Sequence, residues 1–147
     1  MAVYLRFDVA SEVYAMPIAN VIEVAALGQV VAIPRAPGQI LGVRLLHGFI
    51  LAVVDLAAVL RLERSTPPGR LLVAAVGDLR VGFAVDDVTG VTELPEATEE
   101  SESPVLLGAV LADGALIGLI DVARAIEWAA TSAGQAALTD SMRAVLP

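Results

Sequence analysis

The sequence has no cysteine, no lysine and a single histidine. Without cysteine it can form neither disulfide bonds nor cysteine-based zinc sites, and thiol catalysis is excluded. Although 57% of its 147 residues are apolar, no apolar run reaches the roughly 18 residues that a membrane-spanning helix needs. The N-terminus lacks a basic-then-apolar leader, so we expect a cytoplasmic protein that is neither secreted nor inserted in a membrane.

Positive charge is scarce as well. All nine cations are arginine, and 17 acidic residues bring the net charge to −8. The phosphate backbone of nucleic acids rewards clustered cations, so this balance argues against nucleic-acid binding. Because polar residues are few, we expect part of the apolar content to form a surface for a protein partner, or for weak self-association.

Signals of enzyme chemistry are absent: there is no glycine-rich phosphate loop, Ser-His-Asp set or histidine cluster. His47 precedes Gly48 in a predicted turn, which favours a contact with a partner, because a catalytic base there would need a nucleophile or an orienting carboxylate. Asp86 and Asp87 would point to opposite faces of a strand, so we predict that Asp86 ends a strand and Asp87 caps a turn. The sequence predicts no catalytic residue, no metal site and no cofactor.

What is present is a duplication. Residues 41–62 read as a strand, a His47-Gly48 turn, a second strand and a short helix with Asp55 as its N-cap. Residues 107–128 repeat this pattern at a shift of 66, which superposes Gly42 on Gly108 and Asp55 on Asp121.

The beginning of each half repeats too. Residues 3–10 and 13–18 alternate apolar and polar positions, which predicts a hairpin. Residues 70–76 and 79–85 predict the matching hairpin at a shift of 67, and the segment 65–69, Ser-Thr-Pro-Pro-Gly, is the linker between the halves. Many short strands with frequent turns predict an all-β fold of two barrels with a shared core.

The remaining segments are connections and a tail. Residues 18–24 mix a helical turn with a short strand, and residues 34–38 form an extended corner fixed by two prolines. Residues 95–104 contain four glutamates and predict an exposed, mobile loop. We therefore expect one domain over residues 1–128, with lobes of roughly 1–64 and 70–128 that exchange elements, and a helical C-terminal tail over 129–147.

An ordered set of short motifs spans nearly the whole chain. It consists of Tyr14-Ala15-Met16-Pro17-Ile18, Val21-Ile22-Glu23-Val24, Ile33-Pro34-Arg35-Ala36-Pro37, Gly42-Val43, Gly48, Val53-Val54-Asp55-Leu56, Arg70-Leu71-Leu72-Val73, Val81-Gly82-Phe83-Ala84-Val85-Asp86, Val91, Gly108 and Leu119-Ile120-Asp121. This set resembles the CheW family of chemotaxis coupling proteins. The resemblance implies two SH3-like five-stranded β-barrels around a common hydrophobic core, with short helices and a C-terminal helix.

The resemblance also implies a function. Members of the family are adaptors without catalytic activity, which bind the regulatory domain of the histidine kinase CheA and the cytoplasmic tip of chemoreceptors in membrane-associated arrays. The receptor tip, a helical hairpin, would lie in the groove between the barrels, in or near which Val21, Glu23, Gly42 and His47 fall by position. Kinase contact would involve the first-lobe edge over residues 33–39. Its candidate residues are Ile33, Pro34, Arg35, Pro37 and Gln39.

One departure from the family concerns the turn around which the repeat is built. The family commonly has Asn-Leu-Arg-Gly there, whereas this chain has Leu45-Leu46-His47-Gly48. Histidine lacks the permanent charge and the donor fork of arginine. Two alternatives therefore stay open: a divergent adaptor of a non-flagellar two-component pathway, steering pili or another output, and a regulatory module that binds a small molecule in the same groove.

Overall fold

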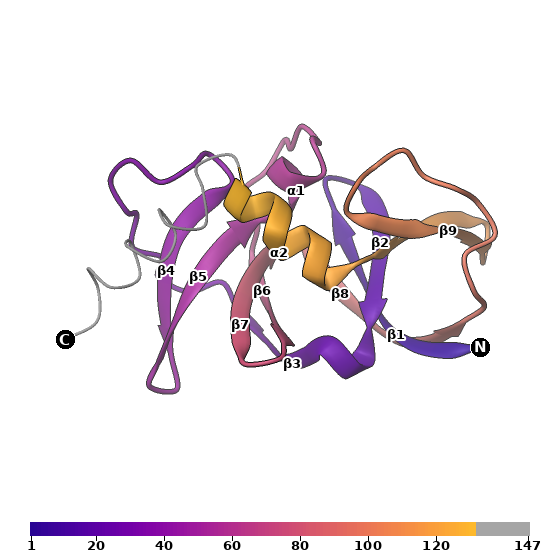
Figure 1. Ribbon diagram of the computed structural model, residues 1–147, viewed down its shortest axis with the longest axis horizontal. Coiled ribbons are helices and arrows are strands. Elements are labelled where there is room, and N and C mark those ends of the chain that lie inside the picture. Colours follow the sequence, from indigo (N-terminus) through magenta and orange to yellow (C-terminus); the bar gives the residue numbers. More distant parts are fainter. Residues whose placement is uncertain (132–147) are drawn as a thin grey trace.

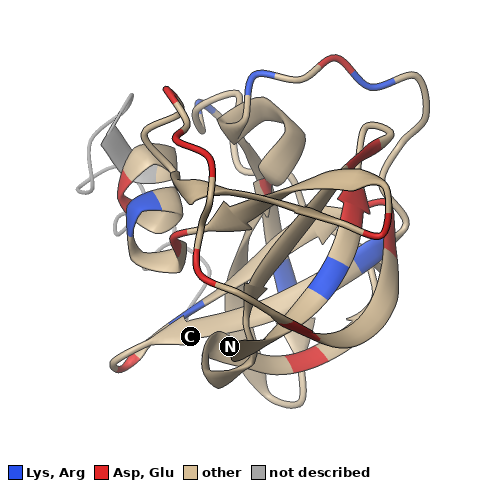
Figure 2. Cartoon of the chain, turned by 90° about the vertical axis from the view of Figure 1, so that its right-hand side faces the viewer, with Lys and Arg blue, Asp and Glu red and all other residues tan. Residues whose placement is uncertain are grey.

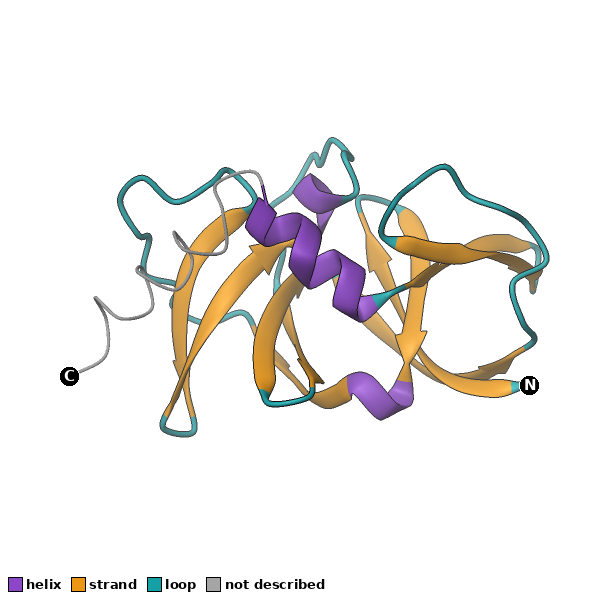
Figure 3. Ribbon diagram, in the orientation of Figure 1, coloured by secondary structure: helices purple, strands orange, loops and turns teal. Residues whose placement is uncertain are grey.

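A computed structural model describes residues 1–131, which form ten short strands and three brief helical segments (Figure 3). In chain order these are β1 (Ala2–Val9), β2 (Glu12–Pro17), the 3-10 helix η1 (Ile18–Asn20), β3 (Val21–Ala26), β4 (Ile40–Leu46), β5 (Phe49–Asp55), α1 (Leu56–Val59), β6 (Arg70–Val76), β7 (Leu79–Val85), β8 (Asp87–Leu94), β9 (Leu106–Ala112), β10 (Ala115–Ile120) and α2 (Val122–Thr131). The all-β prediction is confirmed.

The strands form two five-stranded sheets that lie next to each other along the long axis of the molecule (Figure 1). One sheet, which we call lobe A, has the order β8-β1-β2-β10-β9. The other, lobe B, has the order β3-β6-β7-β5-β4. Each sheet contains one parallel pair, β2 with β10 and β5 with β7, and all other neighbours are antiparallel.

The two sheets are equivalent under the sequence repeat. If each strand is exchanged for its counterpart in the other repeat (β1 with β6, β2 with β7, β3 with β8, β4 with β9 and β5 with β10), the strand order of lobe A becomes that of lobe B. Each lobe therefore takes its first hairpin from one repeat and its other three strands from the other repeat. Lobe B is contiguous in sequence, whereas lobe A joins the two ends of the chain.

Turn chemistry explains the matching hairpins in both repeats. His47 and Gly48 have φ angles of 50° and 80°, and Asp113 and Gly114 have φ angles of 51° and 74°. Two consecutive residues with positive φ make the two-residue turn whose twist suits a β-hairpin, and Gly or Asp adopts it readily. The repeated turn therefore fixes the repeated strand register.

Three apolar clusters hold the fold together. One cluster lies mainly inside lobe A, a second lies inside lobe B, and the third is shared by both lobes and both α-helices. The shared cluster includes Phe7, Met16, Leu56, Leu72, Phe83 and Ile126. Phe7 and Phe83 are fully buried, so the lobes pack through a continuous core.

Most local predictions are confirmed. Residues 18–24 form the 3-10 helix and the start of β3, and Asp55 and Asp121 cap α1 and α2 by accepting hydrogen bonds from Ala57 and Arg124. The prediction for Asp87 is wrong, because Asp87 begins β8 instead of capping a turn. Most of the predicted tail helix, residues 132–147, lies outside the described residues. Over residues 1–131, no helix has both the length and the apolar character to cross a bilayer.

Candidate partner-binding surface

All nine residues expected to contact partners lie in lobe B. They occupy β3, β4, the turn after β4 and the connection between β3 and β4. These two strands are the outer strands of the five-stranded sheet, and we call the line where they approach each other the seam. The outer strands of a sheet carry unpaired backbone groups. Contacts across the seam are therefore made by side chains and not by a continuous ladder of backbone hydrogen bonds.

Glu23 and His47 meet across the seam. The His47 Nε2 atom lies 3.1 Å from Glu23 Oε2, with side chains 68% and 35% exposed, respectively. Arg44, on β4, makes a second link across the seam: its Nε donates to the carbonyl of Leu27, the residue after β3, at 3.0 Å. The structure thus brings together two of the four expected receptor contacts in an accessible polar pair.

Exposed apolar side chains flank this pair. Leu45 and Phe49 are 65% and 52% exposed, and the Arg80 guanidinium lies 4.7 Å from the centroid of the Phe49 ring. Ile22 and Val31 are also exposed. Exposed apolar side chains beside a polar pair suit the apolar face of an amphipathic helix. Sequence reasoning did not single out Phe49; the only signal was an aromatic residue directly after the turn.

The other two expected receptor contacts have structural roles. Gly42 has a φ of 147°, and a Cβ atom on it would lie 2.0 Å from the Val31 carbonyl oxygen. Val31 exchanges two backbone hydrogen bonds with Val43, at 2.8 and 2.9 Å. Gly42 therefore lets the connection cross β4 closely, while Val21 is half-buried against the shared core.

The expected kinase contacts divide into a tip and an anchor. Pro34 and Arg35 are exposed at the tip of the corner, whereas Ile33 and Pro37 are half-buried. Gln39 is the anchor: its side-chain amide donates to the Ala129 carbonyl of α2 at 2.9 Å, and its carbonyl accepts from the Asp55 amide at 2.8 Å. The corner is thus held against the body of the protein at one end.

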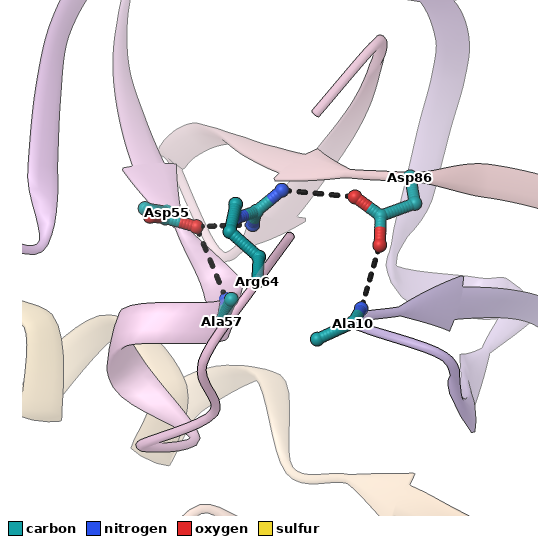
Figure 4. A network of polar contacts seen from close by, with 5 residues as sticks. All are labelled: Ala10, Asp55, Ala57, Arg64 and Asp86. Atoms are coloured by element: carbon teal, nitrogen blue, oxygen red, sulfur yellow. Dashed lines mark hydrogen bonds and ion pairs between the residues drawn. The ribbon is translucent and has the colours of Figure 1, made fainter. Parts of the chain in front are cut away.

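A polar network that sequence reasoning missed connects the lobes (Figure 4). Arg64, 16% exposed, pairs with Asp55 at the start of α1 and with Asp86 after β7, the latter at 2.9 Å. Asp86 in turn accepts from the Ala10 amide in the β1–β2 turn at 2.6 Å. We call this set the inter-lobe clamp. The Asp86 carboxylate is thus engaged by a cation and an amide, and residues 1–131 contain no cluster of potential metal ligands.

Two interleaved five-stranded lobes, with an accessible seam flanked by exposed apolar side chains, are typical of a protein-interaction module. A model of the CheW-like domain matches residues 3–130, and the chain belongs to this family. It is 30% identical over 130 residues to the chemotaxis protein CheW of Thermotoga maritima, which covers 84% of this chain and 86% of that protein. It is 33% identical over 108 residues to the protein FrzA of Myxococcus xanthus, with 67% and 68% covered.

A solved structure confirms the fold. The scaffolding protein TtCheW of Thermoanaerobacter tengcongensis superposes with a TM-score of 0.74 at 24% identity, covering 82% of this chain and 88% of that one. Family membership makes the chain a non-enzymatic scaffolding protein of chemotactic signal transduction, in the family that couples receptors to CheA. The resemblance seen in the sequence motifs is confirmed.

Proposed function

We propose that this protein joins a chemoreceptor to a CheA-type histidine kinase by binding both through lobe B, in the cytoplasm at membrane-associated arrays. The receptor tip would lie along the seam at Val21, Glu23, Gly42 and His47. The kinase regulatory domain would bind the corner over residues 33–39. The observation that carries the proposal is the accessible Glu23–His47 pair, set among the exposed side chains of Leu45 and Phe49.

A helical hairpin such as a receptor tip would offer the seam an apolar stripe bordered by polar residues. Burial of Leu45 and Phe49 against that stripe would supply affinity, at about 25 cal/mol per Å² of apolar surface removed from water. The Glu23–His47 pair would fix the register of the helix, because a register that places a carboxylate of the helix next to Glu23 is penalised.

The corner that would bind the kinase is already ordered. Pro34 and Pro37 restrict the backbone of the corner, and Gln39 ties its end to α2 and to the start of α1. A segment that is already ordered loses less conformational entropy on binding. The exposed Arg35 then offers a donor fork suited to a carboxylate on the partner.

The test is a titration of the protein with a receptor-tip fragment and with the CheA regulatory domain from the same organism. We expect Glu23→Lys to weaken receptor binding by about tenfold or more and to leave kinase binding unchanged, since charge reversal at a central contact costs roughly 1.4 kcal/mol or more. Arg35→Glu should instead weaken kinase binding and leave receptor binding unchanged. Glu63→Lys, an exposed change away from both surfaces, is the matched control.

The outcomes discriminate the alternatives. Binding of the kinase alone would mean that Leu45 and His47 have cost receptor coupling, which favours a divergent adaptor in a non-flagellar pathway. Binding of neither partner by the folded protein would contradict the proposal and favour a regulatory small-molecule module. Equal losses from Glu23→Lys and Glu63→Lys would show that net charge, and not the seam, governs binding.

A further inference from the structure

The seam of lobe B is bridged by a side chain that can change its charge. The Nε2 atom of His47 lies 3.1 Å from Glu23 Oε2, and the ring is exposed to solvent, from which it can take up a proton. Histidine gains or loses its proton between about pH 5 and 8. The link between β3 and the β4–β5 turn is therefore an ion pair when the ring is protonated, and at most a hydrogen bond when the ring is neutral.

No other side chain of this protein is of a type that ordinarily changes its charge in that range. The sequence has one histidine and no cysteine. Its 17 acidic residues outnumber its nine arginines, and they are spread over strands, turns and loops (Figure 2). A proton on His47 thus adds a positive charge to a protein of net charge −8, directly beside one of its carboxylates.

The other charged residues around the turn have different positions or partners. Arg44 on β4 donates to two backbone carbonyls, and Arg80 on β7 lies over an aromatic ring. Asp78 lies in the turn of the neighbouring β6–β7 hairpin. Within residues 1–131, the only ion pair of His47 is with Glu23. Protonation of the ring therefore acts first on the contact with Glu23.

The internal repeat shows that the fold does not require a histidine at this turn. The shift of 66 residues places His47 on Asp113, and the two residues have φ angles of 50° and 51°. Asp113 Oδ2 lies 3.7 Å from Nη1 of Arg6 on β1. Aspartate and arginine ordinarily keep their charges between about pH 5 and 8. Each lobe thus links its hairpin turn to another strand by an ion pair, but only the pair in lobe B contains a ring that titrates near neutral pH.

We propose that Glu23 and His47 form a pH-dependent latch that regulates receptor binding at the seam, an inference that rests on the proposed function of the seam. The protonated ring holds the β4–β5 turn against β3, and with it the exposed side chains of Leu45 and Phe49 on either side of the turn. The neutral ring holds the turn less firmly. Because a surface that is already held in place loses less entropy on binding, the receptor tip binds more tightly on the acidic side of neutral pH.

NMR of the free protein tests the latch without any partner. We expect the carboxylate carbon signal of Glu23 to shift together with the ring signals of His47 between about pH 6 and 8. In His47→Gln, which has no titrating ring, the Glu23 signal should stay constant over the same range. A Glu23 signal that does not follow the ring in the wild type would overturn the latch.

Titration with the receptor-tip fragment at about pH 6 and pH 8, in low salt, tests the regulation. The wild type should bind about threefold more tightly at the lower pH, as suits an exposed ion pair. His47→Arg keeps a positive charge and should bind at both pH values as the wild type does at the lower one. His47→Gln should bind at both as the wild type does at the higher one.

The matched control is Asp113→Asn, which breaks the equivalent pair in lobe A and should keep the pH dependence of the wild type. Circular dichroism verifies that each variant is folded. Groups that titrate on the fragment affect all variants alike, so the same pH dependence in the wild type and His47→Arg would overturn the regulation. If the folded protein binds no receptor tip at either pH, the proposed function fails, and the NMR measurement alone then supports or overturns the latch.

Discussion

At the residue scale, Gly42 matters through the side chain that it lacks. Its φ of 147° and the 2.0 Å approach of a hypothetical Cβ to the Val31 carbonyl oxygen leave no room for alanine. We expect Gly42→Ala to lower the free energy of unfolding by about 3 kcal/mol or more, because either β4 or the bridged connection must shift. Denaturant titration measures the loss.

Gly48 is the control for this prediction. It also has positive φ, at 80°, but no atom of residues 1–131 lies within 4 Å of its hypothetical Cβ. Gly48→Ala should therefore cost only the left-handed backbone penalty of about 1 kcal/mol. If the two variants are equally stable, the crowding at Gly42 is not what constrains it, and a direct receptor contact becomes the better explanation.

Tyr14 makes stability depend on alkaline pH. Burial, and secondarily the hydrogen bond to Glu12 and its negative charge, raise the pKa of the Tyr14 phenol above its ordinary value. The unfolded phenol loses its proton near pH 10 while the folded one keeps it. Above about pH 10 the free energy of unfolding should thus fall, by up to about 1.4 kcal/mol per pH unit.

Denaturant titrations of the wild type and Tyr14→Phe at pH 9 and pH 11 check this expectation. At pH 9, Tyr14→Phe should lower the free energy of unfolding by about 1 kcal/mol, because the hydrogen bond to Glu12 is lost. Between pH 9 and pH 11, the free energy of unfolding of this variant should fall less steeply than that of the wild type. Tyr4 is retained in both proteins, so the comparison isolates the change at Tyr14. If the free energy of unfolding of both proteins falls equally between pH 9 and pH 11, the alkaline effect does not come from Tyr14.

At the scale of elements, the repeat offers two equivalent helix caps with different surroundings. Asp121 accepts from the Arg124 amide at 3.1 Å and faces an exposed arginine side chain. Asp55 caps α1 and also pairs with Arg64, whose buried Nε has no hydrogen-bond partner within residues 1–131. The same residue type at the same repeat position should thus have unequal effects on stability.

We expect Asp121→Ala to lower the free energy of unfolding by about 1 kcal/mol, as for an ordinary N-cap. Asp55→Ala should cost about 3 kcal/mol or more, because it also deprives a largely buried arginine of one of its two carboxylates. Asp55→Asn keeps an oxygen that can cap α1 but removes the negative charge, so it separates the effect of the cap from that of the ion pair with Arg64. Thermal and denaturant unfolding measure all three variants. If Asp55→Ala and Asp121→Ala lower the free energy of unfolding equally, the inter-lobe clamp does not contribute to stability.

Local elements were the most predictable part of this fold. Alternation and turn residues identified the hairpins, and Asp55 and Asp121 were recognised as caps because capping depends on neighbours in sequence. The inter-lobe clamp was not foreseen, since Arg64, Asp86 and Ala10 meet only after three separate segments pack together. Glu23 and His47 were both singled out by resemblance, but their contact follows from the closure of the seam, which no local pattern encodes.

At the scale of the whole molecule, the sequence repeat and the lobes are different divisions of the chain. The repeats meet within residues 65–69, but this linker connects α1 to β6 inside lobe B. Four strand pairs join the repeats: β2–β10 and β5–β7 are parallel, and β1–β8 and β3–β6 are antiparallel. Nothing in a strand's own sequence specifies a partner so far along the chain.

A fragment experiment follows from this interleaving. We expect the pieces 1–66 and 67–147 to be largely unfolded when separate, because neither contains all the strands of either sheet. Mixed in equal amounts, they should associate and recover the strand signal in circular dichroism. The piece 18–86, which contains all five strands of lobe B, should retain more structure than either. Independent folding of the piece 1–66 would contradict the strand order.

The division of lobe A between the chain ends also has a consequence for biosynthesis. The β1–β2 hairpin leaves the ribosome first, yet its parallel neighbour β10 is completed only at Ile120. At about 5–20 residues per second, that delay amounts to roughly 5–20 s. During it, the apolar residues Phe7 and Met16 need cover, and the contiguous lobe B, complete by Val85, supplies the other side of the same core. We expect nascent lobe B to act as the template on which lobe A is assembled.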